Sequence, residues 1–380
     1  MDVMDGAGME EQGSGDGVGN ATDSPPFEFS DYRQRAVVAS LFLLASVVGT
    51  LGNSLVILAV ALSRKLRTAT NAFVVSLSVA DLLTSLAVPL DAVALLGPDE
   101  APLGEWVCKV VAVVLPSTVG CSMYMLAFIG INRYLLITRP NTTYRRVYTP
   151  RLMAVWLAIA WLVPVLIVLL PPVLGVGDVG YNPKYHICGS LSSHEHSNTY
   201  DFLLAGALYP LPLISIVVCY ILLWVHLHRH AQRMVHSPEP SVESTDNRLS
   251  VLSKSVLSLT SQNTLSSPMR SATVSRSRMS RRQIEITKNM FYIVAAFFLC
   301  LTPYAICLFY DDSDPVLPYA AVILFTNSCV NPFIYATKHP HFKAVFKAIF
   351  KRQWDHVPEP SDTLKALRKG TCCCCSGLYA

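Results

Sequence analysis

The chain has 380 residues, of which 52% are hydrophobic and only 15% are charged, and its mean hydropathy is +0.41. A soluble domain carries about 25% charged residues, so this composition excludes an ordinary soluble protein. The net charge of +4 gives no basic surface typical of a nucleic-acid-binding protein. Zinc-type Cys/His spacing, a P-loop and a GxSxG motif are all absent from the sequence. We therefore expect a membrane protein that is not an enzyme.

Seven apolar segments are long enough to cross a bilayer, which takes about 20 residues in a helix. Each run is continuously apolar and does not alternate, which favours helices over a β-barrel. We predict an all-α membrane protein, a seven-transmembrane helix bundle that fills residues 36–337. Its expected spans are 36–62, 72–96, 106–138, 153–176, 200–227, 286–310 and 316–336.

The charges of the connecting loops predict the orientation of the bundle. Arg64 and Lys65 follow the first span, and Arg145 and Arg146 link the third span to the fourth. Acidic residues such as Asp99 lie in loops on the opposite side. Because basic loops face the cytoplasm, we expect the N-terminus outside the plasma membrane and the C-terminus inside.

Four segments outside the predicted spans have an expected character of their own. Residues 1–35 are expected to form a disordered extracellular tail with a glycosylation site at Asn20. Residues 236–282 lack apolar periodicity and predict a disordered third cytoplasmic loop. Residues 338–352 predict an amphipathic cytoplasmic eighth helix. The cytoplasmic tail, 353–380, contains a cysteine cluster that we interpret as an S-acylation site: Cys372, Cys373, Cys374 and Cys375.

Polar residues inside the apolar spans need partners, because each costs a few kcal/mol in hydrocarbon. Asp81 lies in the second span, with Ser122, Asn327 and Asn331 on the third and seventh. One carboxylate with several amides and hydroxyls predicts a small hydrated cation site. Hydrogen bonds that only hold the helices together are the alternative, and for Asn53 on the first span we favour that alternative.

Arg133 lies near the end of the third span and is the only charged residue in the 24 residues that follow Lys109. A guanidinium at the end of a membrane helix is expensive to bury and needs carbonyls, a partner or water. An anchor that reaches the membrane surface is the simpler alternative.

One group of motifs in each span, in order along the chain, resembles the rhodopsin-like (class A) G-protein-coupled receptors. The resemblance covers about residues 36–352, apart from the third cytoplasmic loop. The motifs are Gly52-Asn53, Leu77 with Ala80-Asp81, Asn132-Arg133-Tyr134, Trp161, Pro212 with Tyr220, Phe297 with Cys300 and Pro303, and Asn331-Pro332-Phe333-Ile334-Tyr335.

The resemblance implies a role for each of these positions. It implies a disulfide between Cys108 and Cys188, and a pocket for an allosteric sodium ion at Asp81, Ser122, Asn327 and Asn331. No other cofactor is expected. The resemblance assigns G-protein coupling and activation to Asn132, Arg133, Tyr134, Tyr220, Phe297, Pro303, Asn331, Pro332 and Tyr335. Arrestin and receptor kinases are the other cytoplasmic partners that it implies.

The chain departs from the family pattern at three positions. Asn132 replaces the acid that usually precedes the arginine, and Gln283 lies where many members carry a second acid. Neutral hydrogen bonds of about 1 kcal/mol would replace these charge interactions. We therefore expect appreciable basal signalling. Leu301 replaces a tryptophan of the sixth span, so activation is expected to depend on Phe297.

The expected ligand pocket is largely apolar, and a small, weakly polar or lipid-like ligand fits such a pocket best. Leu115 lies where amine receptors carry an aspartate, which argues against a biogenic amine. Phe325 replaces the lysine of opsins, which excludes retinal. The candidate pocket residues are Asp91, Leu115, Lys184, His186, Leu301 and Tyr304, with a solvated rim as the alternative for Asp91 and Lys184.

The nearest subgroups in these motifs are the melatonin receptors and the invertebrate orphan receptors that guide germ-cell migration and glial barriers. A peptide ligand that docks on the acidic outer loops is the second choice. A seven-helix receptor that does not couple, or that signals through arrestin, remains an alternative. A transporter is not favoured, because the chain shows no internal repeat.

Overall fold

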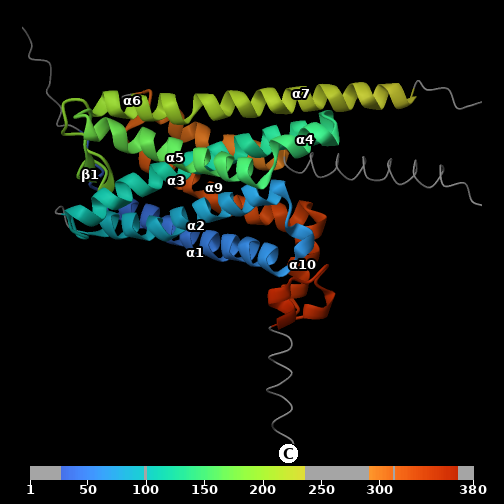
Figure 1. The fold of residues 1–380 in the computed structure, drawn as a ribbon. Helices are drawn as coiled ribbons and strands as arrows, with labels where there is room; N and C mark the ends of the chain where they lie inside the picture. The colour runs from blue at the N-terminus through green and yellow to red at the C-terminus, as the bar shows by residue number, and fades with distance from the viewer. Residues whose placement is uncertain (1–26, 98–100, 236–290, 311–312, 367–380) are drawn as a thin grey trace, which may run out of the picture.

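The helices of the chain run side by side along one long axis in a computed structural model, which describes residues 27–97, 101–235, 291–310 and 313–366 (Figure 1). Six helices of this part are long and apolar enough to cross a membrane, and a shorter apolar helix, Phe291–Cys307, is present as well. That helix is the described part of the predicted sixth span. The prediction of a seven-helix membrane bundle is confirmed.

The first three spans are long helices joined by short connections: α1 (Tyr32–Leu62), α2 (Ala69–Leu96) and α3 (Glu105–Thr138). Side chains cap the first two helices. Asp31 accepts a 2.8 Å hydrogen bond from the backbone N–H of Arg33, and Thr68 accepts one of 3.2 Å from that of Asn71. Such caps satisfy donors that the first turn of a helix leaves free, so each helix begins a few residues before the predicted apolar run.

The middle of the chain contains a short helix that the apolar pattern did not predict, because it lies outside the bilayer-length runs. The helices here are α4 (Asn141–Val147), α5 (Pro150–Val173), α6 (Ser197–Leu208) and α7 (Pro210–Val235). The predicted fifth span is divided into α6 and α7 at Tyr209. Pro210 follows directly, and its missing N–H explains why the helical hydrogen-bond pattern is interrupted there.

A two-stranded antiparallel hairpin covers one end of the bundle (Figure 1). It consists of β1 (Val179–Asn182) and β2 (Ile187–Ser190), with Tyr181 opposite Cys188. The sequence analysis did not predict it, because each strand is only four residues long.

The seventh span, α9 (Leu317–Lys338), is followed by the amphipathic helix α10 (Pro340–Phe350) at the end of the bundle away from the hairpin (Figure 1). Phe342, Val345 and Phe346 are buried on one face of α10, as the predicted 338–352 helix requires. His339 separates the two helices and Pro340 begins the second, a position that proline tolerates because its N–H would have no partner there.

Beyond α10, residues 353–366 fold back on the end of α1. The backbone N–H of Ser361 donates to the carbonyl of Leu62 at 2.8 Å, and that of Arg64 donates to the carbonyl of Glu359 at 2.8 Å. Val357 and Leu364 are buried against Leu62. The tail predicted at 353–380 is therefore structured in its first part, whereas the Cys372–Cys375 cluster lies outside the described residues.

The prediction of a disordered tail over residues 1–35 is wrong at its end. Phe29 is 3% exposed, and its N–H donates to the carbonyl of Lys184 at 2.8 Å. Arg35 is also buried, where its guanidinium donates to the carbonyls of Leu95 and Gly97. Burial of these side chains compensates for the entropy lost when the segment becomes ordered. Asn20 lies outside the described residues.

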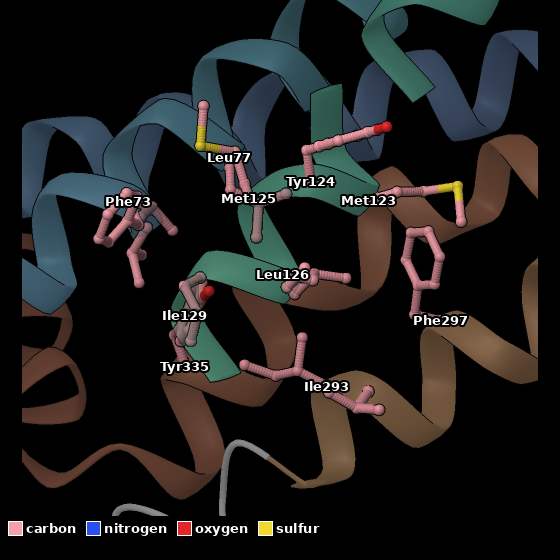
Figure 2. Close-up of a cluster of buried hydrophobic side chains, with 14 of the residues drawn as sticks. Phe73, Leu77, Met123, Tyr124, Met125, Leu126, Ile129, Ile293, Phe297 and Tyr335 are labelled. Carbon is pink, nitrogen blue, oxygen red and sulfur yellow. The ribbon is translucent and has the colours of Figure 1, made fainter. Parts of the chain in front are cut away.

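The main hydrophobic core lies between α2, α3, α9 and the helix Phe291–Cys307. Figure 2 shows Phe297 and Ile293 of the sixth span facing Met123 and Leu126 of α3. Large apolar side chains also cover the outside of the bundle, including Leu51 at 68% exposure, Val173 at 77% and Leu299 at 74%. An exposed apolar surface of this extent fits a protein that is surrounded by lipid.

Candidate functional site

A cavity of about 410 Å³ opens beneath the hairpin. Its wall is formed by α3, α6, α9, the hairpin and the sixth span. Leu115, Leu301 and Tyr304 line it as the sequence predicted, and so do Asp91 and Lys184. A cavity of this volume and largely apolar lining is suited to a small ligand.

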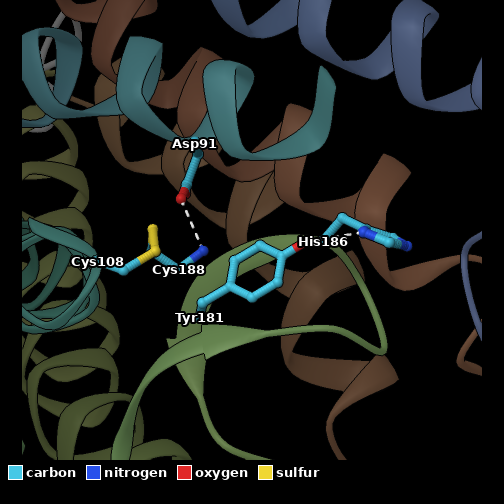
Figure 3. The surroundings of a disulfide bond; sticks show 5 residues. All are labelled: Asp91, Cys108, Tyr181, His186 and Cys188. Carbon is cyan, nitrogen blue, oxygen red and sulfur yellow. Dashed lines mark hydrogen bonds between the residues drawn. A yellow bond between two sulfur atoms is a disulfide. The ribbon is translucent and has the colours of Figure 1, made fainter. Parts of the chain in front are cut away.

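The disulfide between Cys108 and Cys188 attaches the hairpin to α3, and this prediction is confirmed (Figure 3). Asp91 on α2 adds a second attachment, because its Oδ1 accepts a 3.0 Å hydrogen bond from the backbone N–H of Cys188. Asp91 is 2% exposed, which excludes the alternative of a solvated rim residue. The hairpin is therefore held over the cavity from two helices.

His186 does not line the cavity, so the prediction is wrong for this residue. Its ring bonds the hydroxyl of Tyr181 at 2.9 Å (Figure 3). It also lies 3.2 Å from a carboxylate oxygen of Glu28. The backbone of His186 has a positive φ of 54°. In the turn between the strands this left-handed conformation directs the side chain away from the cavity.

The rim of the cavity is held by polar contacts to the loop before α9. Lys184 pairs with Asp314 at 2.8 Å, and the hydroxyl of Tyr185 donates a 2.5 Å hydrogen bond to the same carboxylate. Burial raises the pKa of Tyr185 above its ordinary value, and the interaction with Asp314 raises it further. The Tyr185 hydroxyl therefore remains a neutral donor at physiological pH.

A second polar site lies in the middle of the bundle around Asp81, which is 1% exposed. Its Oδ1 accepts from Ser122 at 3.0 Å and from Ser328 at 3.2 Å, and its Oδ2 accepts from Asn331 at 2.8 Å. Three helices thus converge on one carboxylate. Asn327 is buried nearby on α9, but no described hydrogen bond joins it to Asp81.

Gly52 and Asn53 attach α1 to α9 next to this polar site. Nδ2 of Asn53 donates to the carbonyls of Gly49 at 2.9 Å and Ser328 at 2.8 Å. A Cβ on Gly52 would lie 2.8 Å from Cγ of Pro332, closer than carbon atoms pack. The glycine therefore permits the close approach of the two helices, and Asn53 has the structural role that we expected.

At the opposite end of the bundle from the hairpin, Arg133 is 5% exposed. Tyr144, Tyr220 and Tyr335 lie near its guanidinium. Within the described residues its guanidinium forms no ion pair, and its Nε and the hydroxyls of Tyr220 and Tyr335 are buried without a hydrogen-bond partner. An unsatisfied buried donor costs about 1–3 kcal/mol. A hydrogen-bond acceptor placed beside the Nε of Arg133 would remove this cost.

Asn132, next to Arg133, is fully buried, and both polar atoms of its side chain form hydrogen bonds. Its Oδ1 accepts from Thr70 at 2.6 Å and its Nδ2 donates to the hydroxyl of Tyr144 at 3.1 Å. These bonds connect α3 to α2 and to α4. Gln283 lies outside the described residues.

The structure brings most of the predicted residues together in three groups: the outer cavity, the Asp81 cluster and the Arg133 end. Tyr134 is half-buried after Arg133, and Pro303 lies six residues after Phe297 in the sixth span. The sequence analysis missed Ser328, although it adjoins Asn327. It also missed Asp201, an acid inside the predicted fifth span that lines the cavity.

These features together define a seven-helix membrane receptor. They are a ligand-sized cavity closed by a disulfide-bound hairpin, an intramembrane carboxylate, and a buried arginine at the far end. Residues 52–335 match the family model described as 7 transmembrane receptor (rhodopsin family). The chain belongs to this family, whose members are signalling receptors and not enzymes.

Known relatives agree with this assignment. The chain is 27% identical to the G-protein coupled receptor moody of Drosophila melanogaster over 86% of its own length and 53% of that receptor, so it spans about half of it. It is 34% identical to the melatonin receptor type 1B-A of Danio rerio over 56% of this chain and 72% of that receptor. It is 29% identical to the protein trapped in endoderm-1 of Drosophila melanogaster over 83% of this chain and 76% of that protein.

The fold has a solved counterpart. The structure of squid rhodopsin superimposes with a TM-score of 0.65 over 91% of this chain and 96% of that chain, at 21% sequence identity. At this identity the likeness concerns the fold alone.

Proposed function

We propose that the chain is a receptor of the plasma membrane, with its N-terminus outside, that activates a heterotrimeric G protein when a ligand occupies the outer cavity. The observation that carries the proposal is the buried Arg133, whose Nε lacks a partner beside two unpaired tyrosine hydroxyls. When the sixth span moves outward, the end of a G protein inserted between the helices would supply acceptors for these donors.

The core packing supports this route of activation. Phe297 is 4% exposed and packs in the cluster that joins the sixth span to α3. Outward movement of the sixth span requires Phe297 to repack. Leu301, one turn later on the same helix, lines the cavity, so this movement couples the cavity to the Arg133 end. Tyr220 and Tyr335 lie on α7 and α9, where they would stabilise the open state.

We propose a small ligand with a mostly apolar body, since leucine, alanine and aromatic side chains form much of the cavity wall. A peptide ligand is the second candidate. In that case the extended chain would have to enter past the hairpin, which is held by the disulfide and by Asp91.

Sodium is proposed as an allosteric ion at Asp81. The carboxylate and the hydroxyls of Ser122 and Ser328 supply the oxygen ligands that a hard cation prefers. A cation bound there would offset the charge of a carboxylate that α2, α3 and α9 bury in the bundle.

Arrestin and receptor kinases are proposed as further partners of the cytoplasmic side. Their expected contact regions, the third cytoplasmic loop at 236–282 and the distal tail, lie outside the described residues. The same is true of the proposed glycan on Asn20 and the proposed acyl chains on the cysteine cluster.

Nucleotide exchange by purified G proteins tests the proposal directly. Wild-type receptor in lipid nanodiscs should accelerate exchange on at least one G-protein class, and Arg133→Ala should not. Arrestin recruitment, measured in parallel in cells, separates the alternative. Recruitment without exchange on any class would indicate a receptor that signals through arrestin and would refute the coupling proposal.

A further inference from the structure

Among the described residues, the wall of the outer cavity carries three carboxylates but one ammonium group. The acids are Asp91 on α2, Asp201 on α6 and Asp314 before α9, and the base is Lys184 of the hairpin turn. Lys184 pairs with Asp314 at 2.8 Å, so these two charges offset each other. Asp91 and Asp201 remain as two acids in the wall that pair with no base in the described residues.

Asp91 and Asp201 have no cationic partner at ion-pair distance anywhere in the described part of the chain. The only hydrogen bond described for Asp91 comes from the backbone N–H of Cys188, and the side chain is 2% exposed. Asp201 contacts the side chain of Ser190, and Lys184 acts on it only at longer range. A carboxylate that is removed from water without a counter-charge is costly, so the buried Asp91 favours a positive group, and the half-buried Asp201 favours one to a smaller extent.

Tyr304 lines the same cavity as the two acids. It lies near enough to both Asp201 and Asp91 for their charges to act on its hydroxyl. Tyr209 and Phe309 line the cavity as well. Aromatic faces attract ammonium and guanidinium groups, so the rings and the carboxylates favour the same kind of ligand.

We infer that the cavity binds a small molecule with an apolar body and one positively charged group, held between Asp91 and Asp201 beside Tyr304. The inference rests on the proposed function and specifies the ligand of the same cavity. The part of α3 that lines the cavity, including Leu115, carries no acid, so the cation is held from α2 and α6 instead. The same carboxylates repel a ligand whose polar end is a carboxylate or phosphate.

Three probes with one body and different heads test the inference: phenylbutylammonium, phenylbutanol and phenylbutanoate. The Tm of purified full-length receptor is measured against the concentration of each probe, which yields an apparent Kd. A charge-assisted contact should make the ammonium bind about tenfold more tightly than the alcohol, and the carboxylate should bind most weakly.

Variants identify the side chains that bind the ammonium group. In the double variant Asp91→Asn and Asp201→Asn, the ammonium should bind no more tightly than the alcohol. Asparagine at position 91 retains an oxygen that can accept from the N–H of Cys188. Asp201→Asn alone leaves that hydrogen bond untouched and should already reduce the preference for the ammonium over the alcohol. Glu105→Gln is the matched control, because this acid lies outside the cavity, pairs with Lys109 and has a 75% exposed side chain.

The inference is overturned if the carboxylate binds as tightly as the ammonium, if no probe raises the Tm, or if Asp91→Asn with Asp201→Asn keeps the full preference for the ammonium. The measurement requires no G protein. Failure of the coupling proposal would therefore leave this result unchanged, and the two failures are distinguishable.

Discussion

Oγ1 of Thr70 donates a 2.6 Å hydrogen bond to Oδ1 of Asn132, and this contact joins the ends of α2 and α3 beside Arg133. In this chain an amide occupies the position where the family usually has a carboxylate. The bond holds the helices together without adding a negative charge next to the guanidinium. The described contacts of Asn132 at this end of the bundle are therefore neutral hydrogen bonds, to Thr70 and to the hydroxyl of Tyr144.

Restoring the carboxylate should strengthen the inactive state. Asn132→Asp keeps an acceptor for Thr70 and adds a charge beside Arg133. A gain of about 1–2 kcal/mol would lower ligand-free G-protein activation about 5–30-fold. The activation is measured in cells at equal surface expression. Asn141→Asp, the same change at the exposed start of α4, should leave it unaltered, and an unchanged signal in Asn132→Asp would refute the explanation.

A cation–π contact connects the sixth span to α9 in the described structure. Nζ of Lys338 lies 5.1 Å from the centre of the Tyr292 ring, which is half exposed. Such a contact contributes about 0.5–1 kcal/mol, so Lys338→Met should raise basal activation about 2–5-fold. Lys343→Met on the exposed face of α10 is the control. Equal activation in both variants would show that the contact does not restrain the sixth span.

Sodium should stabilise the receptor through the Asp81 cluster. Replacing choline chloride by sodium chloride at constant ionic strength should raise the Tm of wild type, and Asp81→Asn should abolish the effect. Because Ser328 bonds the carboxylate at 3.2 Å, Ser328→Ala should weaken the sodium effect more than Asn327→Ala. A sodium response that survives in Asp81→Asn would place the ion elsewhere.

The contact of α1 with α9 should tolerate no side chain at residue 52. Gly52→Ala places a methyl group 2.8 Å from Pro332, and overpacking of this kind costs about 1–3 kcal/mol. A lower Tm is the expected result. Gly206→Ala on α6 is the matched control, because a Cβ there meets nothing within 4 Å and alanine favours a helix. Equal Tm values for both variants would contradict the described packing.

The residues that sequence reasoning located best are polar groups in apolar runs. Asp81, Asn331 and Arg133 stand out because hydrocarbon penalises them, and the structure buries all three. The spans were predictable for the same reason, since only bilayer-length apolar runs form such helices.

Contacts between distant short segments could not be predicted. Ser361 bonds Leu62 through backbone groups, which carry no sequence signal. Nothing in the sequence distinguishes Ser328, and its role follows only from the orientation of α9, which places its hydroxyl beside Asp81. The sequence analysis predicts His186 as a cavity residue, but a left-handed turn directs it to Glu28 and Tyr181.

Ligand-free G-protein activation by wild type and Arg133→Ala tests the central claim most directly. The account predicts a basal signal above that of cells without the receptor, abolished by Arg133→Ala and preserved by Arg151→Ala at the exposed start of α5. A basal signal in Arg133→Ala equal to that of wild type would contradict the account. So would a wild type that activates no G-protein class.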